Sequence, residues 1–262
     1  MKKTVSAVLL TVLFTGCSTH KAVVVPVESV ASTYQLTDIA DERIEMDSRF
    51  DAQPSAAAIA LLENYKQRVD DIMSPVVGES THAMVGQRDR ESDLANLVAD
   101  VLRYGSEKYT GKKADLGLIN FGGLRNSLPG GKLTFGSVFE VLPFENTLVI
   151  MKMKGTDVIR LFRQICVIRD GGFSGANIVS KNRELQSVRI AGEEVQPDKV
   201  YTLATVDYVA EGNDGFTVLK EITDWEVPEG ATVRQCMLDY IAEKTARGEK
   251  IDAQVEGRFI QE

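Results

Sequence analysis

Two short segments of the chain carry residues whose types and spacing suit the binding of a flat, polar ligand. In the first, "NFGGLR", Gly122 and Gly123 lack the Cβ atom that keeps backbone away from a ligand. Arg125 lies just beyond them and can donate several hydrogen bonds to a carboxylate, a phosphate or a ribose hydroxyl. The glycine pair and the arginine together predict a backbone cradle beside a cation.

Aromatic rings complete this pattern. In "VLPFENTL", Phe144 projects a ring at the entry to an expected strand, and Asn146 follows two residues later on the same face. A later segment, "DYVAEGNDGF", supplies Tyr208 and then Asp214 in a glycine turn. Each aromatic ring that stacks on a base contributes about 1–3 kcal/mol, and a carboxylate accepts hydrogen bonds from ribose hydroxyls. With Asn120 at the end of a buried strand, these residues predict a nucleoside pocket.

Each of these residues also has an ordinary structural role open to it. Phe144 can be a core aromatic at a strand start, and Arg125 a solvated turn residue. Asp214 can serve only to close an Asx turn. Residue types and spacing alone leave these alternatives open.

Other catalytic chemistries find little support in the sequence. The chain has two histidines, His20 and His82, so a dinuclear phosphatase centre that needs several histidines cannot be assembled from it. A carboxylate-only Mg²⁺ site stays open because acidic residues are abundant. No G-x-S-x-G sequence is present, and nothing in the local sequence pairs His82 with Ser174 of "GFSGA". We expect neither a catalytic residue nor a cofactor in this chain.

The composition is that of an ordinary globular protein, with 262 residues and a net charge of −8. Because it contains no basic tract, we expect no binding to nucleic acid. The N-terminus has Lys2 and Lys3, a short apolar run and then "LFTGC", which resembles a bacterial lipoprotein signal; a plain signal peptide is the alternative. We expect a signal peptide over 1–16, followed by lipidated Cys17 and a tether over 17–43. The lipid would anchor the protein in the bacterial cell envelope, at the outer membrane, on its periplasmic or surface side.

The remainder, 44–262, is expected to form one α/β (α+β) domain with a mixed β-sheet packed with helices. Cys166 and Cys236 can form a disulfide or remain as buried thiols. Apolar periodicity predicts helices at 55–73, 91–109, 156–166 and 229–246, with a short helix or turn at 134–142. It predicts strands at 114–120, 147–155, 171–179, 185–192, 200–209 and 255–261, with a strand or hairpin at 76–85.

Five motifs in order give the chain a resemblance to a known family. They are "RDRESDLANLVADVL", "NFGGLR", "VLPFENTL", "FSGA" and "YVAEGNDGF". Over roughly residues 75–225 they resemble the C-terminal, substrate-recognition domain of the 5'-nucleotidases. The resemblance implies that domain's fold and binding of a nucleoside or nucleotide.

Carried over position by position, the resemblance implies a set of substrate-binding residues. Phe144 and Tyr208 would sandwich the base, Asn146 and Gly175 would touch its edge, and Asp214 would bind ribose hydroxyls. The residues expected to reach ribose or phosphate are Arg88, Asn120 and Arg125, with Arg90 as a helper. Three positions depart from the family pattern. Tyr208 replaces the usual phenylalanine and keeps an aromatic ring for stacking, and Ala95 and Asn213 each replace a glycine. An asparagine at 213 can still adopt a positive φ.

In the full enzymes of this family a metallophosphatase domain with two metal ions precedes the recognition domain. Here the resemblance implies half of such an enzyme, a subunit that needs a separate metallophosphatase partner with divalent metal ions for phosphoester hydrolysis in nucleotide catabolism. The alternatives are a non-catalytic surface lipoprotein that binds nucleosides or nucleotides, and a domain whose pocket no longer binds. Hydrolysis by the isolated chain is not expected.

Overall fold

A computed structural model describes residues 41, 43–45, 47–50 and 55–262 of the chain. The predicted signal peptide, Cys17 and all but two residues of the predicted tether lie outside the described residues. Within them, the main compact unit spans 54–262, and no described helix is both long and apolar enough to cross a bilayer. The prediction that the domain begins at residue 44 stays a prediction.

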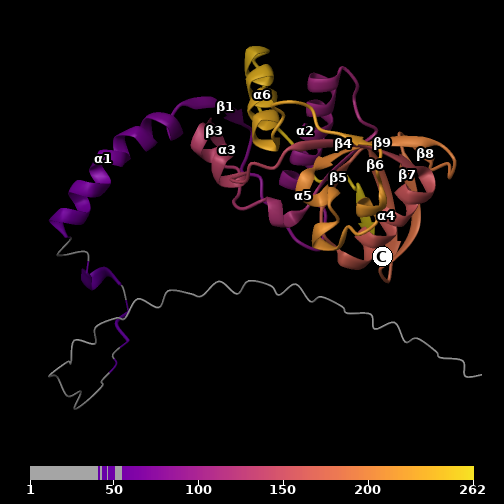
Figure 1. Cartoon of the computed structure of the whole chain (residues 1–262), viewed down its shortest axis with the longest axis horizontal. Helices are drawn as coiled ribbons and strands as arrows, with labels where there is room; N and C mark the ends of the chain where they lie inside the picture. Colours follow the sequence, from indigo (N-terminus) through magenta and orange to yellow (C-terminus); the bar gives the residue numbers. More distant parts are fainter. Residues whose placement is uncertain (1–40, 42, 46, 51–54) are drawn as a thin grey trace, which may run out of the picture. The chain divides into compact units, whose positions relative to one another are not determined.

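A five-stranded mixed sheet forms the centre of this unit (Figure 1). Its strand order is β10-β4-β9-β2-β5, in which β2 runs parallel to β9 while β4 is antiparallel to β9 and β5 antiparallel to β2. The strands are β2 (Leu116–Ile119), β4 (Leu148–Lys154), β5 (Gly172–Ser174), β9 (Val200–Val206) and β10 (Trp225–Glu226). The buried apolar runs of β2 and β4 match the continuous hydrophobic pattern expected of strands covered on both faces.

The remaining strands form two further sheets. One has the order β11-β6-β7-β8, with β6 (Ala176–Lys181), β7 (Glu184–Ile190), β8 (Glu193–Glu194) and β11 (Phe259–Gln261). The other pairs β1 (Val76–Ser80) with β3 (Gly131–Thr134). The predicted mixed α/β class is therefore confirmed, with the strands divided among three sheets in the described part of the chain.

Two helices cover opposite faces of the central sheet. Successive residues of β5 point to opposite faces, and Gly172 lies against α2 (Asp93–Thr110) while Phe173 packs edge-on against Phe162 of α4 (Gly155–Ile168). A Cβ atom at Gly172 would stand 2.4 Å from the Cβ of Ala95, so glycine is needed for this close approach. Ala95 itself thus faces the sheet and not a ligand.

The other helices lie around this core. They are α1 (Ala56–Met73), α3 (Phe135–Val141), α5 (Asp207–Ala210) and α6 (Val233–Ala246). Each of the five predicted helical segments overlaps a helix of the structure, with ends that differ by up to four residues, which confirms that these helices exist. Cys166 in α4 and Cys236 in α6 are free and buried, so the thiol alternative is the one the structure contains. Burial raises the pKa of Cys236 to about 12.

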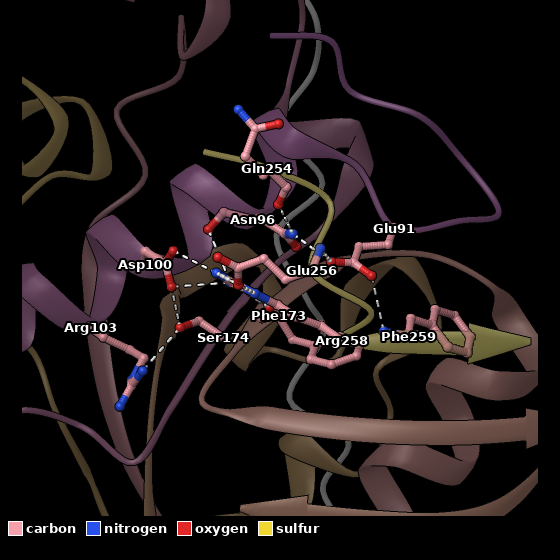
Figure 2. A network of polar contacts seen from close by, with 10 residues as sticks. All are labelled: Glu91, Asn96, Asp100, Arg103, Phe173, Ser174, Gln254, Glu256, Arg258 and Phe259. Atoms are coloured by element: carbon pink, nitrogen blue, oxygen red, sulfur yellow. Dashed lines mark hydrogen bonds and ion pairs between the residues drawn. The ribbon is translucent and has the colours of Figure 1, made fainter. Parts of the chain in front are cut away.

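A buried polar network fastens the C-terminal segment to α2 and β5 (Figure 2). Arg258 donates to both carboxylate oxygens of Asp100, at 3.1 and 2.8 Å, and to the carbonyl oxygen of Phe173 at 3.2 Å. Glu91 accepts from the side chain of Asn96 at 2.7 Å and from the backbone N–H of Glu256 at 2.8 Å. Glu91 and Asn96 of "RDRESDLANL" therefore have a structural role.

Candidate functional site

The strand directions bring three loops to one edge of the central sheet. Because β2 and β9 are parallel, their carboxyl ends share an edge, and antiparallel β4 begins there, with Leu148 opposite Val206. In open α/β sheets, this is where ligands bind. A cavity of about 310 Å³ opens between the loops, a size at the low end for small-molecule sites. Its lining residues are Asn120, Gly122, Gly123, Arg125, Phe144, Asn146, Tyr208 and Asp214.

Asp214 is the centre of the polar contacts in this cavity. Its Oδ2 accepts a hydrogen bond from Asn120 Nδ2 at 2.6 Å, and its Oδ1 accepts one from the Tyr208 hydroxyl at 3.1 Å. The bond to Asp214, followed by the charge of that carboxylate, raises the pKa of Tyr208. A carboxylate has about four acceptor positions, so Asp214 keeps capacity for ligand hydroxyls while its orientation is fixed.

The backbone around Asp214 differs in one respect from the expectation for Asn213. The left-handed residue is Asp214 itself, with a φ of 53°, between Gly212 and Gly215 at positive φ. Asn213 instead donates from Nδ2 to the carbonyl oxygen of Tyr208 at 2.8 Å, which closes the turn. The turn forms without a glycine at 213 because the amide side chain supplies a local bond.

The glycine pair lies against the same polar contact. A Cβ atom at Gly123 would stand 2.9 Å from Asn120 Oδ1, and one at Gly122 would stand 3.2 Å from Asp214 Oδ2. Larger residues here would displace Asn120 or Asp214. The glycines thus allow the turn after β2 to pack closely beside the carboxylate as well as to line the cavity.

The two aromatic side chains border the cavity with their rings partly open to solvent. Phe144 is 45% exposed and Tyr208 is 42% exposed, so neither is a core aromatic. The guanidinium of Arg125 lies 5.8 Å from the centre of the Phe144 ring, and its Nη1 donates to the carbonyl oxygen of Gly122 at 3.4 Å. This places a cation beside an aromatic face at the cavity wall.

A residue that the sequence reasoning missed holds the two aromatic loops together. Asp207 accepts hydrogen bonds from the backbone N–H and the hydroxyl of Thr147, at 3.2 and 3.0 Å. Its own N–H donates to the carbonyl oxygen of Thr147 at 3.0 Å. Thr147 comes three residues after Phe144, and Asp207 directly precedes Tyr208, so these bonds fix the spacing of the rings.

Arg88 lies next to the cavity but does not line it. Its Nη1 donates to Asp170 Oδ2 at 2.7 Å, and its guanidinium covers the Phe121 ring at 5.0 Å. Asp170, only 7% exposed, also accepts from the backbone N–H of Phe121 at 2.7 Å. Arg88 therefore supports the turn after β2 through Asp170. Asp170 is the second residue that the sequence did not predict. Arg90 is exposed in the same segment.

The structure does not place Gly175 with the other predicted site residues. It lies against the carbonyl oxygen of Asp115, before the amino end of β2, because β5 runs antiparallel to β2 and carries the chain away from the cavity. At about 3.3 Å per residue, this is about 15 Å from Asn120 along the strand. Gly175 lines a different cavity, with Asp100, Arg103 and Arg258 among its neighbours.

Among the described residues, the side chains that could bind a metal ion or act as a nucleophile do not form a catalytic arrangement. His82 lies between Asp93 and Asp252, at 3.4 and 3.5 Å, and its Nδ1 is 2.9 Å from the Thr81 hydroxyl. Ser174 hydrogen-bonds to Asp100 and not to His82. No cluster of three or more His, Cys, Asp or Glu side chains in the described ranges is arranged to hold a metal ion.

Comparison with known proteins assigns the family. Residues 76–221, which contain the whole cavity, match the family model described as the 5'-nucleotidase, C-terminal domain. This chain belongs to that family. The match includes the turn after β2, the Phe144 loop and the Asp214 turn, so the family region and the geometric site coincide.

The relatives are much longer proteins. "Endonuclease YhcR" of Bacillus subtilis is 31% identical over 195 residues, which is 71% of this chain and 15% of the relative. "Protein UshA" of Escherichia coli is 28% identical over 163 residues, 60% of this chain and 29% of the relative. A 5'-nucleotidase precursor from Thermus thermophilus, solved by crystallography, superposes with a TM-score of 0.69 at 30% identity, covering 78% of this chain and 43% of its own.

Proposed function

We propose that this chain is the nucleoside- and nucleotide-recognition half of a split 5'-nucleotidase. The observation that carries this proposal is the cavity bordered by Phe144, Tyr208, Asn120 and Asp214, in a chain that spans a third or less of the length of curated relatives such as UshA. Two of those relatives are named as a nucleotide phosphoesterase and a 5'-nucleotidase. A separate metal-bearing phosphatase subunit would supply the remaining part of the reaction.

Each lining residue has a defined task in this proposal. The base enters between Phe144 and Tyr208, and Asn146 hydrogen-bonds to its edge. Asp214 accepts the ribose hydroxyls through the positions that Asn120 and Tyr208 leave open. Arg125 donates toward the phosphate side, since its guanidinium has five N–H groups and one contact to Gly122 uses only one of them.

Hydrolysis requires chemistry that this half does not carry. The divalent metal ions of the partner would activate water and stabilise charge on the phosphoryl oxygens. This chain would contribute orientation and substrate choice. Lipid anchoring at Cys17 in the bacterial cell envelope would favour assembly, because confinement to one membrane surface raises the effective concentration of the two halves.

A calorimetric titration of residues 18–262 with adenosine and with AMP tests the recognition role. Wild type should bind both ligands saturably, and Phe144→Ala should weaken binding by about 5- to 150-fold, the equivalent of one lost stacking contact. Tyr65→Ala is the matched control because Tyr65 is an exposed aromatic on α1, outside the cavity, and should leave the Kd unchanged. No binding at millimolar ligand would refute the assignment of the cavity.

The alternative, a non-catalytic surface binding protein, predicts the same titration but a different result in cells. If deletion of this protein leaves AMP hydrolysis by intact cells unchanged while the purified chain binds adenosine, the binding-protein alternative is correct. If hydrolysis falls and returns on adding the gene back, the split enzyme is correct.

A further inference from the structure

Helix α1 exposes an apolar stripe to solvent along its length. Leu61, Leu62, Tyr65, Val69 and Ile72 are each 50–65% exposed. At 100° per residue, these five side chains fall within an arc of about 100° on one side of the helix, the width of the face by which an amphipathic helix normally packs. Exposed apolar patches of this kind mark interaction sites.

The charges on α1 are arranged around this stripe. Lys66 is adjacent to Leu62 and Val69 on one flank, and Arg68 is adjacent to Tyr65 and Ile72 on the other, since residues three and four apart are neighbours on a helix. The acidic side chains are on the opposite side of the helix: they are Glu63, Asp70 and Asp71. The complementary surface is therefore an apolar groove with acidic rims.

This charge pattern disfavours a second copy of the chain as the occupant. In an antiparallel helix pair, equivalent flanks face each other, so Lys66 would meet Lys66 and Arg68 would meet Arg68. In a parallel pair, opposite flanks face each other, so Lys66 would meet Arg68. Both pairings set cation against cation.

A polar hollow of about 520 Å³ continues the stripe at the C-terminal end of α1. It lies where α1 meets α3, and its lining residues include Met73, Ser74, Asn126, Ser127, Thr134, Ser137 and Glu140. Asn126 directly follows Arg125 of the candidate site. An occupant that covers the stripe and fills the hollow therefore borders the loop that carries Arg125.

We propose that the α1 stripe and this hollow form the docking surface for the separate phosphatase subunit, an inference that rests on the proposed function. The family match begins at residue 76, directly after α1, and the match is to a C-terminal domain whose relatives carry most of their length outside it. The surface thus lies where the longer relatives continue into the rest of their chains. A lipid surface accepts an apolar stripe flanked by cations, but it does not fill a polar hollow.

A matched pair of substitutions tests this docking surface in the full-length protein. Leu62→Asp places a charge in the stripe, and Gln67→Asp makes the same charge change on the opposite side of α1. Each variant replaces the wild-type gene in the native cells, and AMP hydrolysis by the membrane fraction is measured. We expect a loss of at least about tenfold for Leu62→Asp and less than about twofold for Gln67→Asp, with the adenosine Kd of both purified variants unchanged.

A photo-crosslinking residue at Tyr65 identifies the occupant directly. We expect a cross-link in cells to a protein that, once purified, hydrolyses AMP only when this chain and a divalent metal ion are both added. A cross-link to a second copy or to lipid, or equal hydrolysis by both variants, overturns the docking surface but not the recognition role. Hydrolysis in wild-type cells that does not depend on this chain overturns the split enzyme and, with it, the docking proposal.

Discussion

The Arg258 network allows a quantitative prediction about folding stability. The Arg258 side chain is only 10% exposed and donates to Asp100, Glu256 and the Phe173 carbonyl. Removing one partner of a buried ion pair costs about 3–5 kcal/mol. Because the Asp100 side chain is 36% exposed, water compensates part of this loss, and we expect Arg258→Ala to lower the free energy of unfolding by about 2–4 kcal/mol.

Urea denaturation of residues 18–262 measures this loss, and Arg247→Ala is the control. Arg247 makes ion pairs with Glu243 and Glu249 while 53% exposed, so its removal should cost less than about 1 kcal/mol. For a domain of this size, a loss of 2–4 kcal/mol corresponds to a decrease in Tm of roughly 5–15 °C. Equal stabilities for the two variants would refute the reasoning that the network fastens the C-terminal segment.

Three further predictions address the site, the core and the thiols. Asp214→Asn should weaken adenosine binding by roughly 10- to 150-fold, because hydrogen bonds to a charged group contribute about 1.5–3 kcal/mol. Calorimetry with 2',3'-dideoxyadenosine, which lacks the ribose hydroxyls, should give the same Kd for wild type and variant. A different Kd of the variant for this analogue would count against a contact between Asp214 and the ribose. Gly172→Ala should destabilise the fold by at least about 1–3 kcal/mol in urea denaturation, because its Cβ would overlap Ala95; wild-type stability would show that α2 can move away. Burial raises the pKa of Cys236 to about 12, above the ordinary thiol pKa near 8.5 of the unfolded chain. The free energy of unfolding is therefore unaffected by this thiol below pH 8.5 and falls as pH rises toward 12, because the unfolded state loses the thiol proton first. Melting curves from pH 8 to 10.5 should show a steeper fall in Tm for wild type than for Cys236→Ala, and parallel curves would contradict this.

Much of the fold follows from local sequence patterns. The helical period over 91–109 and 156–166 predicted α2 and α4, and the apolar runs at 114–120 and 147–155 predicted β2 and β4. These patterns are local, so they do not depend on which strands are neighbours. The division into three sheets could not be predicted, because it depends on long-range pairing.

The same distinction separates the site residues. Phe144 and Tyr208 border the same cavity because β4 and β9 are antiparallel neighbours. The family motifs predict that the two residues share a site, but they do not give this strand pairing. Gly175 was assigned to the site from a motif alone, and the direction of β5 places it at the other end of the sheet. Asp170 was missed because its partners, Arg88 and Phe121, are distant in sequence.

The exposed stripe of α1 marks a further limit of sequence reasoning. The spacing of Leu62, Tyr65 and Val69 predicts an amphipathic helix, and periodicity normally implies that the apolar side is buried. Whether an apolar side meets the chain's own core or solvent depends on tertiary contacts. For α1, only the three-dimensional arrangement shows that this apolar side is exposed and not part of the core.

We propose that this chain recognises nucleotides but does not hydrolyse them alone. The most direct measurement is a titration of purified residues 18–262 with AMP in the presence of Mn²⁺, followed by measurement of phosphate released in the same sample. We predict saturable binding with no phosphate above the buffer control. Stoichiometric or catalytic release of phosphate by the pure chain, or the absence of binding at millimolar AMP, would contradict the claim.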